Sequence, residues 1–309
     1  MLDIIIITVA NKYQKDYLDN YIKNNECYNK YRIYTIISNN GTGTALLDAI
    51  NLKEKIKCNS RVLLINSGGK SERTKLFAKN GKVFIPIPDN NSNTIILNKI
   101  IDFYNNIKDK ILPDGILVYA SDVILDNYNI SSIEESCALS TLVKKEYGPE
   151  HGVFIKKYDN IYKFLHKELL TVLEKEKAII SNKVLIDTGV YFLDNNSLNI
   201  LKKDYKNNYK NKEFINFYGE MINHLLNITN LKLIVLKNTN FYHLGNYKKY
   251  QEYIFSIIKD KYYLYNSTIE DNVSIGNKSM IFNCKLNNIT IPSNSIVYMK
   301  DEEIVIEKI

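Results

Sequence analysis

The chain has 309 residues, 45% of them hydrophobic, which is enough for one large α/β core with a smaller module and too apolar for general disorder. Its formal charge of +7 comes from dispersed lysines, so charge alone is compatible with nucleic acid and with a phosphate-rich small substrate. The longest apolar run, residues 4–9, is too short to span a membrane, and no signal peptide is recognisable. Four cysteines without metal-site or redox-pair spacing favour reduced thiols. We therefore expect a cytoplasmic protein.

Apolar β-branched runs alternate with stretches of helical spacing along the first 120 residues. This alternation is typical of βα units on a parallel sheet and predicts a Rossmann-like α/β fold with a mixed, mostly parallel sheet. Further strands after residue 122 are expected to extend the sheet into a substrate-binding half. Strands are expected at 2–9, 31–37, 61–65, 115–119, 153–155, 161–165, 184–192 and 233–236, and helices before residue 29 and at 45–55, 94–107 and 247–258.

The last fifty residues follow a different period. Ile269, Ile275 and Ile281 recur every six residues, and Ile291 and Val297 resume that spacing after a shift of four. A six-residue period predicts a short left-handed β-helix of the hexapeptide-repeat type at the C-terminus. The alternative is an antiparallel cap of two or three strands, because a period of two also fits these positions.

A Gly-Gly turn follows the expected strand at 61–65. Gly68 and Gly69 can present backbone N–H groups to a phosphate at the carboxyl end of a parallel strand. Arg73, one of only three arginines, and Lys82 follow this turn and can bind phosphate oxygens. A P-loop is excluded, since Leu64 stands where that motif needs glycine. The alternative is a structural turn with solvated charges.

Two other strand ends carry polar or flexible segments. Residues 41–44 form a Gly-Thr-Gly-Thr loop that lets a base or ribose approach the backbone, or else an ordinary turn that opens a helix. Asp122 follows the strand at 115–119, where a carboxylate can hold Mg²⁺ while the ion keeps substrate phosphates and water; the alternative is a helix cap.

Taken in order, these segments resemble the L-fucose-1-phosphate guanylyltransferase (fucose pyrophosphorylase) family of sugar nucleotidyltransferases. The resemblance spans most of the chain, although each matching piece is short. The matching pieces are Thr8-Val9-Ala10-Asn11 with Gln14, Gly41-Thr42-Gly43-Thr44-Ala45, Ser67-Gly68-Gly69-Lys70-Ser71-Glu72-Arg73, Gly81-Lys82, Ser121-Asp122-Val123, Glu150-His151-Gly152-Val153-Phe154, Phe164-Leu165-His166-Lys167, Asp187-Thr188-Gly189-Val190 and Phe241-Tyr242-His243-Leu244-Gly245.

The resemblance implies a role for each matching residue. Arg73 would grip the β- and γ-phosphates, Lys82 would lie near the α-phosphate, and Asp122 would hold Mg²⁺. His243 is a metal ligand, a phosphate contact or a packed histidine. The expected nucleotide-binding residues are Gly41, Thr42, Gly43, Thr44, Gly68 and Gly69, and the expected sugar-phosphate-binding residues are His151, Lys167 and Asp187.

The resemblance also implies a reaction and its partners. We expect a Mg²⁺-dependent enzyme that makes GDP-L-fucose from GTP and L-fucose 1-phosphate and releases pyrophosphate. Alternatives are another sugar 1-phosphate, such as a heptose, or a non-catalytic nucleotide-sugar binding protein. The sugar 1-phosphate would come from a separate sugar kinase, and we expect a homo-oligomer that binds neither nucleic acid nor membrane. The expected domains are a nucleotidyltransferase domain at 1–258 and a short β-helix domain at 259–309.

Overall fold

The computed structural model describes residues 3–38, 40–58, 61–68, 75–89, 92–208 and 214–309. The chain forms two compact units. The first comprises Met1–Lys70 and Ile100–Phe241, and the second comprises Ser71–Lys99 and Tyr242–Ile309. The boundary expected at residue 258 does not coincide with this division, because the segment from Ser71 and the helix before the C-terminal strands belong to the second unit.

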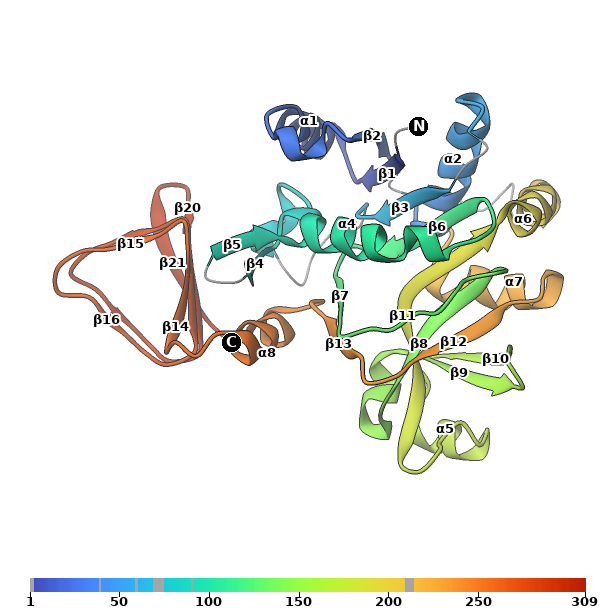
Figure 1. Cartoon of the computed structure of the whole chain (residues 1–309). Helices are drawn as coiled ribbons and strands as arrows, with labels where there is room; N and C mark the ends of the chain where they lie inside the picture. The colour runs from blue at the N-terminus through green and yellow to red at the C-terminus, as the bar shows by residue number, and fades with distance from the viewer. Residues whose placement is uncertain (1–2, 39, 59–60, 69–74, 90–91, 209–213) are drawn as a thin grey trace. The chain divides into compact units, whose positions relative to one another are not determined.

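The first unit is built on one nine-stranded sheet with the order β2-β1-β3-β6-β11-β8-β12-β10-β9. Figure 1 shows it running from β2 and β1 at the top of the view to β9 and β10 below. Its strands are β1 (Asp3–Val9), β2 (Tyr31–Ile37), β3 (Val62–Asn66), β6 (Gly115–Ala120), β8 (Cys137–Lys144), β9 (Gly152–Lys157), β10 (Asn160–His166), β11 (Lys183–Asp194) and β12 (Lys232–Leu236).

The sheet confirms an α/β architecture, but it is parallel mainly in its first half. Strands β2, β1, β3 and β6 pair in parallel, as the βα alternation predicts. In the second half β11 runs antiparallel to β6 and β8, and β9 and β10 form an antiparallel hairpin. Only β8 and β12 pair in parallel there among the described ladders. The expectation of a mostly parallel sheet is therefore wrong beyond β6, where a hairpin replaces helical crossovers.

Helices pack against this sheet through apolar residues. Buried side chains of α2 (Thr42–Lys55), including Leu46 and Ile50, join those of β1, β3 and β6 in one core cluster. The same cluster includes residues of α6 (Asn195–Asn208), α7 (Ile222–Ile228) and the π-helical turn η5 (Phe217–Met221). The remaining helices of this part are α1 (Lys12–Lys23), α4 (Ile96–Ile107), which continues from the second unit, and α5 (Leu170–Lys175).

The second unit joins the hairpin of β4 (Pro86–Asp89) and β5 (Ser92–Ile95) to the C-terminal strands through α8 (Tyr247–Ile257). Tyr250 donates a hydrogen bond to the carbonyl oxygen of Pro86, and the Gln251 side-chain amide donates to Lys278 O at 2.7 Å. The ring of Phe77 meets those of Tyr250 and Phe282 edge-on, with centroids 5.5 and 5.6 Å apart. These contacts explain why residues far apart in sequence form one unit.

Short parallel strands form the C-terminal part, which has a triangular outline in Figure 1. Strands from successive turns of the chain pair in parallel here. The pairing places Ile269 beside Leu286, Ile275 beside Ile291 and Ile281 beside Val297. The alternative of an antiparallel cap is therefore wrong, except that the last two strands pair antiparallel. The hand of this C-terminal coil stays a prediction. Its strands are β14 (Tyr262–Tyr265), β15 (Thr268–Ile269), β16 (Ser274–Ile275), β17 (Ser279–Phe282), β18 (Lys285–Leu286), β19 (Thr290–Ile291), β20 (Ser295–Lys300) and β21 (Glu303–Lys308).

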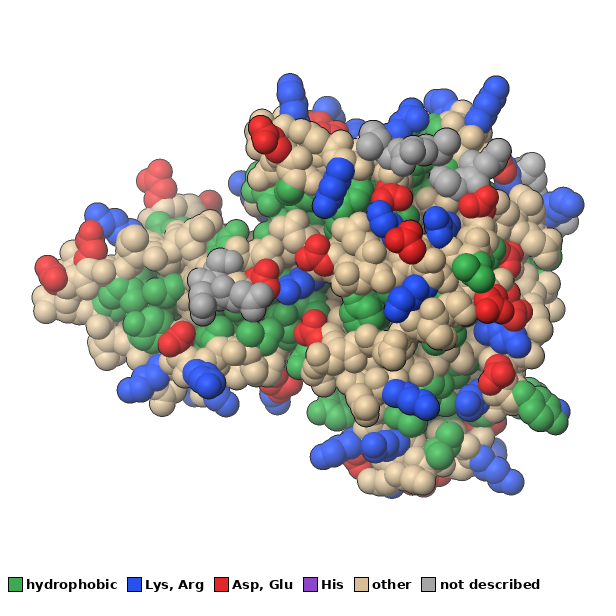
Figure 2. Space-filling model, viewed as in Figure 1, with side chains coloured by type: hydrophobic (Ala, Val, Ile, Leu, Met, Phe, Trp, Pro, Cys, Tyr) green, Lys and Arg blue, Asp and Glu red, His purple; other side chains and the backbone are tan. Residues whose placement is uncertain are grey.

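The C-terminal coil has its own apolar core, which includes Ile281, Leu286 and Val297. Hydrophobic side chains also gather on the face of the coil that Figure 2 shows.

Replacing fully buried Ile281 by alanine should lower the free energy of unfolding by about 2–5 kcal/mol, because the cavity left in so small a core cannot collapse fully. Urea unfolding measures this loss, and Thr290→Ala, at an exposed position of β19, is the matched control. Equal unfolding midpoints for the two variants would contradict the packing described.

Among the described residues, no helix is both long and apolar enough to cross a membrane.

Candidate functional site

The candidate site lies at the carboxyl ends of β1, β3 and β6, where neighbouring strands end in register. Thr8 pairs with Asn66, and Asn66 pairs with Ala120. The loops that follow are hydrogen-bonded to these ends: Ser67 N donates to Thr8 Oγ1 at 3.1 Å, and Ser121 N donates to Asn66 O at 3.1 Å. This is the edge at which open α/β sheets bind their ligands.

Asp122 lies in the turn between β6 and the short strand β7 (Val123–Asp126). Because a strand follows, the alternative that Asp122 caps a helix is wrong. Its charge reaches Tyr218, a half-buried residue of η5: burial chiefly, then the charges of Asp187 and Asp122, raise the pKa of the Tyr218 hydroxyl. Asp122 and Asp187 therefore act on one hydroxyl, although 65 positions separate them in the sequence.

Asp187 is held at an irregularity in β11. The register between β11 and β8 shifts between Asp187 and Tyr191, and within that shift Gly189 adopts a φ of 75°. Gly189 N donates to Asp187 Oδ1 at 2.7 Å, which fixes the carboxylate, and only 8% of Asp187 is exposed. A Cβ at Gly189 would lie 2.9 Å from that of Ala120, so this turn packs directly against the end of β6 that carries Asp122.

His151 and Lys167 meet beside Asp187. Lys167 N donates to His151 O at 3.0 Å, directly after the ladder in which Gly152 pairs with His166. A Cβ at Gly152 would lie 3.1 Å from Asp187 Cβ, which places this hairpin end against the carboxylate. The His151 ring is buried edge-on to Phe241, whereas the Lys167 side chain is exposed. The structure thus brings the three predicted sugar-phosphate residues into one neighbourhood.

Three polar residues at this site have no role assigned from the sequence, although Ser67 and His166 lie in segments that match the family. Asn66 Nδ2 donates to Tyr218 Oη at 3.4 Å, while Asn66 Oδ1 and Ser67 Oγ are buried without a hydrogen-bond partner in the described part of the chain. His166 Nδ1 is likewise buried and unpaired, and burial, followed by the charge of Lys167, lowers the His166 pKa. Buried polar atoms without partners are rare, so they suit a polar ligand. Asn66 precedes the Gly-Gly turn, a signal that could have found it.

The Gly41–Thr44 loop opens α2 and packs on the segment 215–217. Gly43 N donates to Ile215 O at 2.9 Å, and Phe217 N donates to Thr42 Oγ1 at 2.9 Å. Gly41, with a φ of 101°, precedes the helix, and Thr44 Oγ1 donates to Asn40 O. The Gly43 amide and the Thr42 hydroxyl are thus engaged within the protein. A nucleotide role for this loop stays a prediction.

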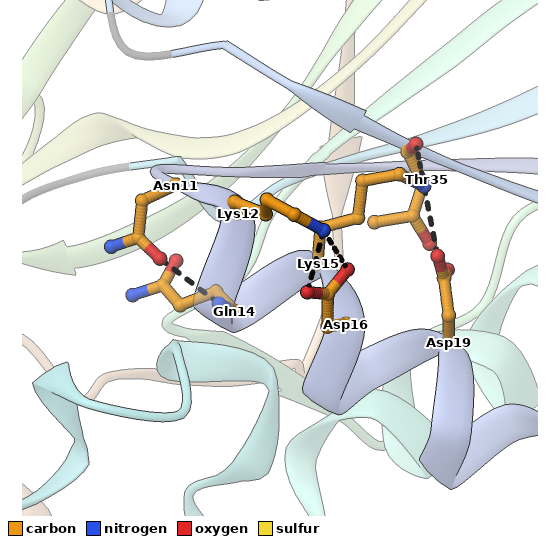
Figure 3. Close-up of polar contacts among 7 residues, drawn as sticks. All are labelled: Asn11, Lys12, Gln14, Lys15, Asp16, Asp19 and Thr35. Atoms are coloured by element: carbon orange, nitrogen blue, oxygen red, sulfur yellow. Dashed lines mark hydrogen bonds and ion pairs between the residues drawn. The ribbon is translucent and has the colours of Figure 1, made fainter.

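The helix after β1 begins with a reciprocal cap. Gln14 N donates to Asn11 Oδ1 and Ala10 N donates to Gln14 Oε1, both at 2.9 Å. Figure 3 shows Asn11 and Gln14 facing each other at the start of α1, with Lys15 reaching Thr35 O on β2. These residues fix the loop at the end of β1, which explains the matching segment there as structural support for the site.

The remaining predicted phosphate and metal residues are Gly68, Gly69, Arg73, Lys82 and His243. Gly68 packs against the end of β2, since a Cβ there would lie 2.3 Å from Ser38 O. Gly69 and Arg73 lie outside the described residues. Lys82 begins a short 3₁₀ turn and His243 ends β13 (Asn240–His243); both belong to the second unit. Their roles stay predictions.

The carboxylates of the site determine what kind of metal ion it could hold. Among the described residues, no group of three or more His, Cys, Asp or Glu side chains could hold a metal ion by itself. Magnesium needs fewer protein ligands, because it is bound through one or two carboxylates and completes its shell with water and substrate phosphates. The Asp187 turn packs against the end of β6 that precedes Asp122, so the site offers two carboxylates, one on β11 and one just after the neighbouring strand β6; Mg²⁺ binding by them stays a prediction.

The sequence of the chain matches one protein-family model and is distantly similar to two curated proteins. The model of the fucose pyrophosphorylase domain matches residues 54–225. Fucose-1-phosphate guanylyltransferase of Mus musculus is 22% identical over 330 residues, covering 80% of this chain and 56% of the relative. The Homo sapiens protein of the same name is 24% identical over 290 residues, covering 70% of this chain and 47% of the relative. The chain spans about half the length of these curated relatives.

Among solved structures, a mannose-1-phosphate geranyltransferase from Thermus thermophilus is similar with a TM-score of 0.41 and 9% identity. That comparison covers 99% of this chain and 95% of the other.

Proposed function

The chain belongs to the fucose pyrophosphorylase domain family, and on that premise we propose that it is a sugar-1-phosphate nucleotidyltransferase. It would join a nucleoside triphosphate to a sugar 1-phosphate and release pyrophosphate. The observation that carries this proposal is the packing of the Asp187–Gly189 turn against the end of β6 that precedes Asp122, beside His151 and Lys167. Buried Asp187 and half-buried Asp122 would hold Mg²⁺ between the protein and the phosphates, and exposed Lys167 adds a cation nearby.

The proposed reaction makes modest chemical demands on the protein. The attacking group is a phosphate oxygen of the sugar 1-phosphate, which is already anionic at neutral pH, so no general base is required. Catalysis then consists of aligning two polyanions and compensating their charge. Lys167 would hold the sugar phosphate, while Arg73 and Lys82 keep the triphosphate roles that the resemblance implies.

We propose Mg²⁺ as the cofactor, with Asp122 as its protein ligand and Asp187 as a second carboxylate. A bound Mg²⁺ ion would neutralise charge on the transferring phosphate and on the pyrophosphate. The chain's own part would be to orient the two carboxylates. Gly189 N does this for Asp187 by donating to Oδ1. The role of His243 as a metal ligand stays a prediction from the resemblance.

The finer assignments follow the same family. We propose GTP and L-fucose 1-phosphate as the substrates, because the two distant relatives named above are fucose-1-phosphate guanylyltransferases. A heptose 1-phosphate or another sugar 1-phosphate is the alternative. We also propose a cytoplasmic location, a separate kinase that supplies the sugar phosphate, and a left-handed C-terminal coil, the hand that hexapeptide spacing favours.

A substrate panel tests this proposal. Each of the four nucleoside triphosphates is combined with a set of sugar 1-phosphates, and pyrophosphate release is followed. The highest kcat/KM is expected with GTP and L-fucose 1-phosphate. Preference for another pair would keep the reaction class and replace the substrate. Tight binding of a nucleotide sugar without turnover of any pair would favour the non-catalytic alternative.

A further inference from the structure

A cavity of about 510 Å³ lies in the first unit between the end of α2 and the start of α6. Its buried wall consists of Ile50, Lys53 and Leu198. Its exposed rim is lined by Glu54, Lys57 and Asn199. This volume falls within the range of pockets that bind small molecules. None of the motifs that carry the family resemblance contributes to it.

The cavity lies at the opposite end of the sheet from the candidate site. Asp194, just before α6, pairs with Gly115 at the start of β6, whereas Asp122 follows the end of β6. Six residues of strand span about 20 Å at roughly 3.3 Å per residue. Asn195, which also lines the cavity, is tied to the same strand start, because its N–H donates to Asp114 O at 3.1 Å. A ligand in the cavity therefore could not be a substrate bound at Asp122.

Lys53 gives this cavity a buried positive charge. Only 6% of Lys53 is exposed, and its ammonium donates to Cys58 O at 2.7 Å and to Asn195 Oδ1 at 3.1 Å. Both acceptors are neutral, and within the described ranges no carboxylate pairs with Lys53. Glu54, which also lines the cavity, forms its ion pair with Lys202 instead, so its charge is compensated by that lysine. A buried charge without a counter-charge is costly, so an anion that enters the cavity would be held strongly.

We propose that this cavity binds a small organic phosphate monoester. The phosphate would accept hydrogen bonds from Lys53 and pair with Lys57 at the rim. We favour a phosphate over a carboxylate ligand, because two cations match the double negative charge of a phosphate monoester. Ile50 and Leu198 would pack against the organic part, and the Asn199 amide would bind its hydroxyl groups. The site is independent of the proposed reaction, so it stands or fails separately.

Cys58 provides a local probe, because its half-buried thiol lines the cavity. The full chain is treated with iodoacetamide, and alkylation of each cysteine is followed by peptide mass spectrometry with added glycerol 3-phosphate. At about ten times the Kd the unliganded fraction falls to about one in eleven, so alkylation of Cys58 should slow by about tenfold. Alkylation of exposed Cys27 should not change. Uncharged glycerol should protect neither thiol.

Two variants and a control test the role of charge. Lys53→Met removes the buried ammonium, and Asn199→Glu places a carboxylate at the exposed rim without disturbing the core. Both should reduce protection of Cys58 to less than about twofold at the same glycerol 3-phosphate concentration. Lys55→Met, at an exposed position of α2, should keep full protection. If Lys53→Met does not fold, Asn199→Glu alone decides.

Equal protection by glycerol, protection that survives in the folded charge variants, or no protection of wild-type Cys58 at saturating glycerol 3-phosphate would each overturn the proposal. Lys53 would then have only a structural role, in which its hydrogen bond to Cys58 O stabilises the turn after α2. None of these outcomes depends on nucleotidyl transfer.

Discussion

Asp122→Asn is expected to lower kcat by about 10²- to 10³-fold, because the amide keeps the shape of the side chain but removes the charge proposed to hold Mg²⁺. Asp122 lies in a turn after β6, outside the apolar core, so the variant should fold normally. Steady-state pyrophosphate release measures kcat, and thermal unfolding measures stability. Raising the Mg²⁺ concentration should recover part of the activity if the loss is in metal affinity.

Asp114→Asn is the matched control for this change. Asp114 is an exposed carboxylate that precedes β6 at the opposite end of the same strand. It should leave kcat near that of the wild type. Full activity of Asp122→Asn, or full wild-type activity in excess chelator, would remove Asp122 and the metal from the mechanism.

Arg73→Lys is expected to lower kcat/KM by about 10²-fold, comparable to the loss of one transition-state hydrogen-bond donor. The substitution keeps the formal charge and removes the planar fork that holds two phosphate oxygens at once. The chain has only three arginines, which indicates that this geometry matters at Arg73. Initial rates over a range of triphosphate concentrations measure the effect, and thermal unfolding should change little.

The two other arginines serve as controls, and the structure predicts a different effect for each. Arg32 on β2 is exposed, with its guanidinium 5.2 Å from the centre of the Tyr34 ring, so Arg32→Lys should change neither kinetics nor stability appreciably. Arg61 donates to Lys108 O and Ile111 O, both at 2.5 Å, so Arg61→Lys should reduce stability and leave kcat/KM intact. Equal turnover by all three lysine variants would show that the turn at Arg73 is structural.

The first half of the sheet could be predicted from the sequence because three of its four strands, β1, β3 and β6, are buried on both faces. Residues 4–7 of β1 and all residues of β3 are buried, and their side chains are apolar except for the amide of Asn66. Such continuous apolar runs are easily recognised as strands in a sequence. The central strand β8 was missed. Its apolar run contains Ser140 and Thr141, which are tolerated because their hydroxyls donate to Ile186 O at 2.8 Å and Leu236 O at 3.3 Å. The two strands that flank β8, β11 and β12, supply one acceptor each, and residue spacing in the sequence cannot reveal that.

In the C-terminal coil, too, the sequence predicts the repeat but not every core position. Its period could be predicted, since Ile269, Ile275 and Ile281 each occupy one of three successive short strands. The apparent four-residue shift has a structural cause. Leu286 fills the next core position only five residues after Ile281, and Ile291 follows after five more. Leucine in place of a β-branched residue concealed this position.

The candidate site could be predicted where motifs follow strand ends. Asp122 was found this way, because the carboxyl ends of parallel strands meet at one edge. Tyr218 could not be predicted. It is one of 24 tyrosines and comes from a π-helical turn, and only the folded chain brings its hydroxyl to Asn66 at the end of β3.

Nucleotidyl transfer itself is tested most directly by measuring both products of one reaction. GTP, L-fucose 1-phosphate and Mg²⁺ are incubated with the wild-type chain, and pyrophosphate and nucleotide sugar are quantified together. The two products are expected in equal amounts, with formation of both abolished when either substrate is omitted. Pyrophosphate formed without nucleotide sugar, or no product with any pair of triphosphate and sugar 1-phosphate, would contradict the proposed activity.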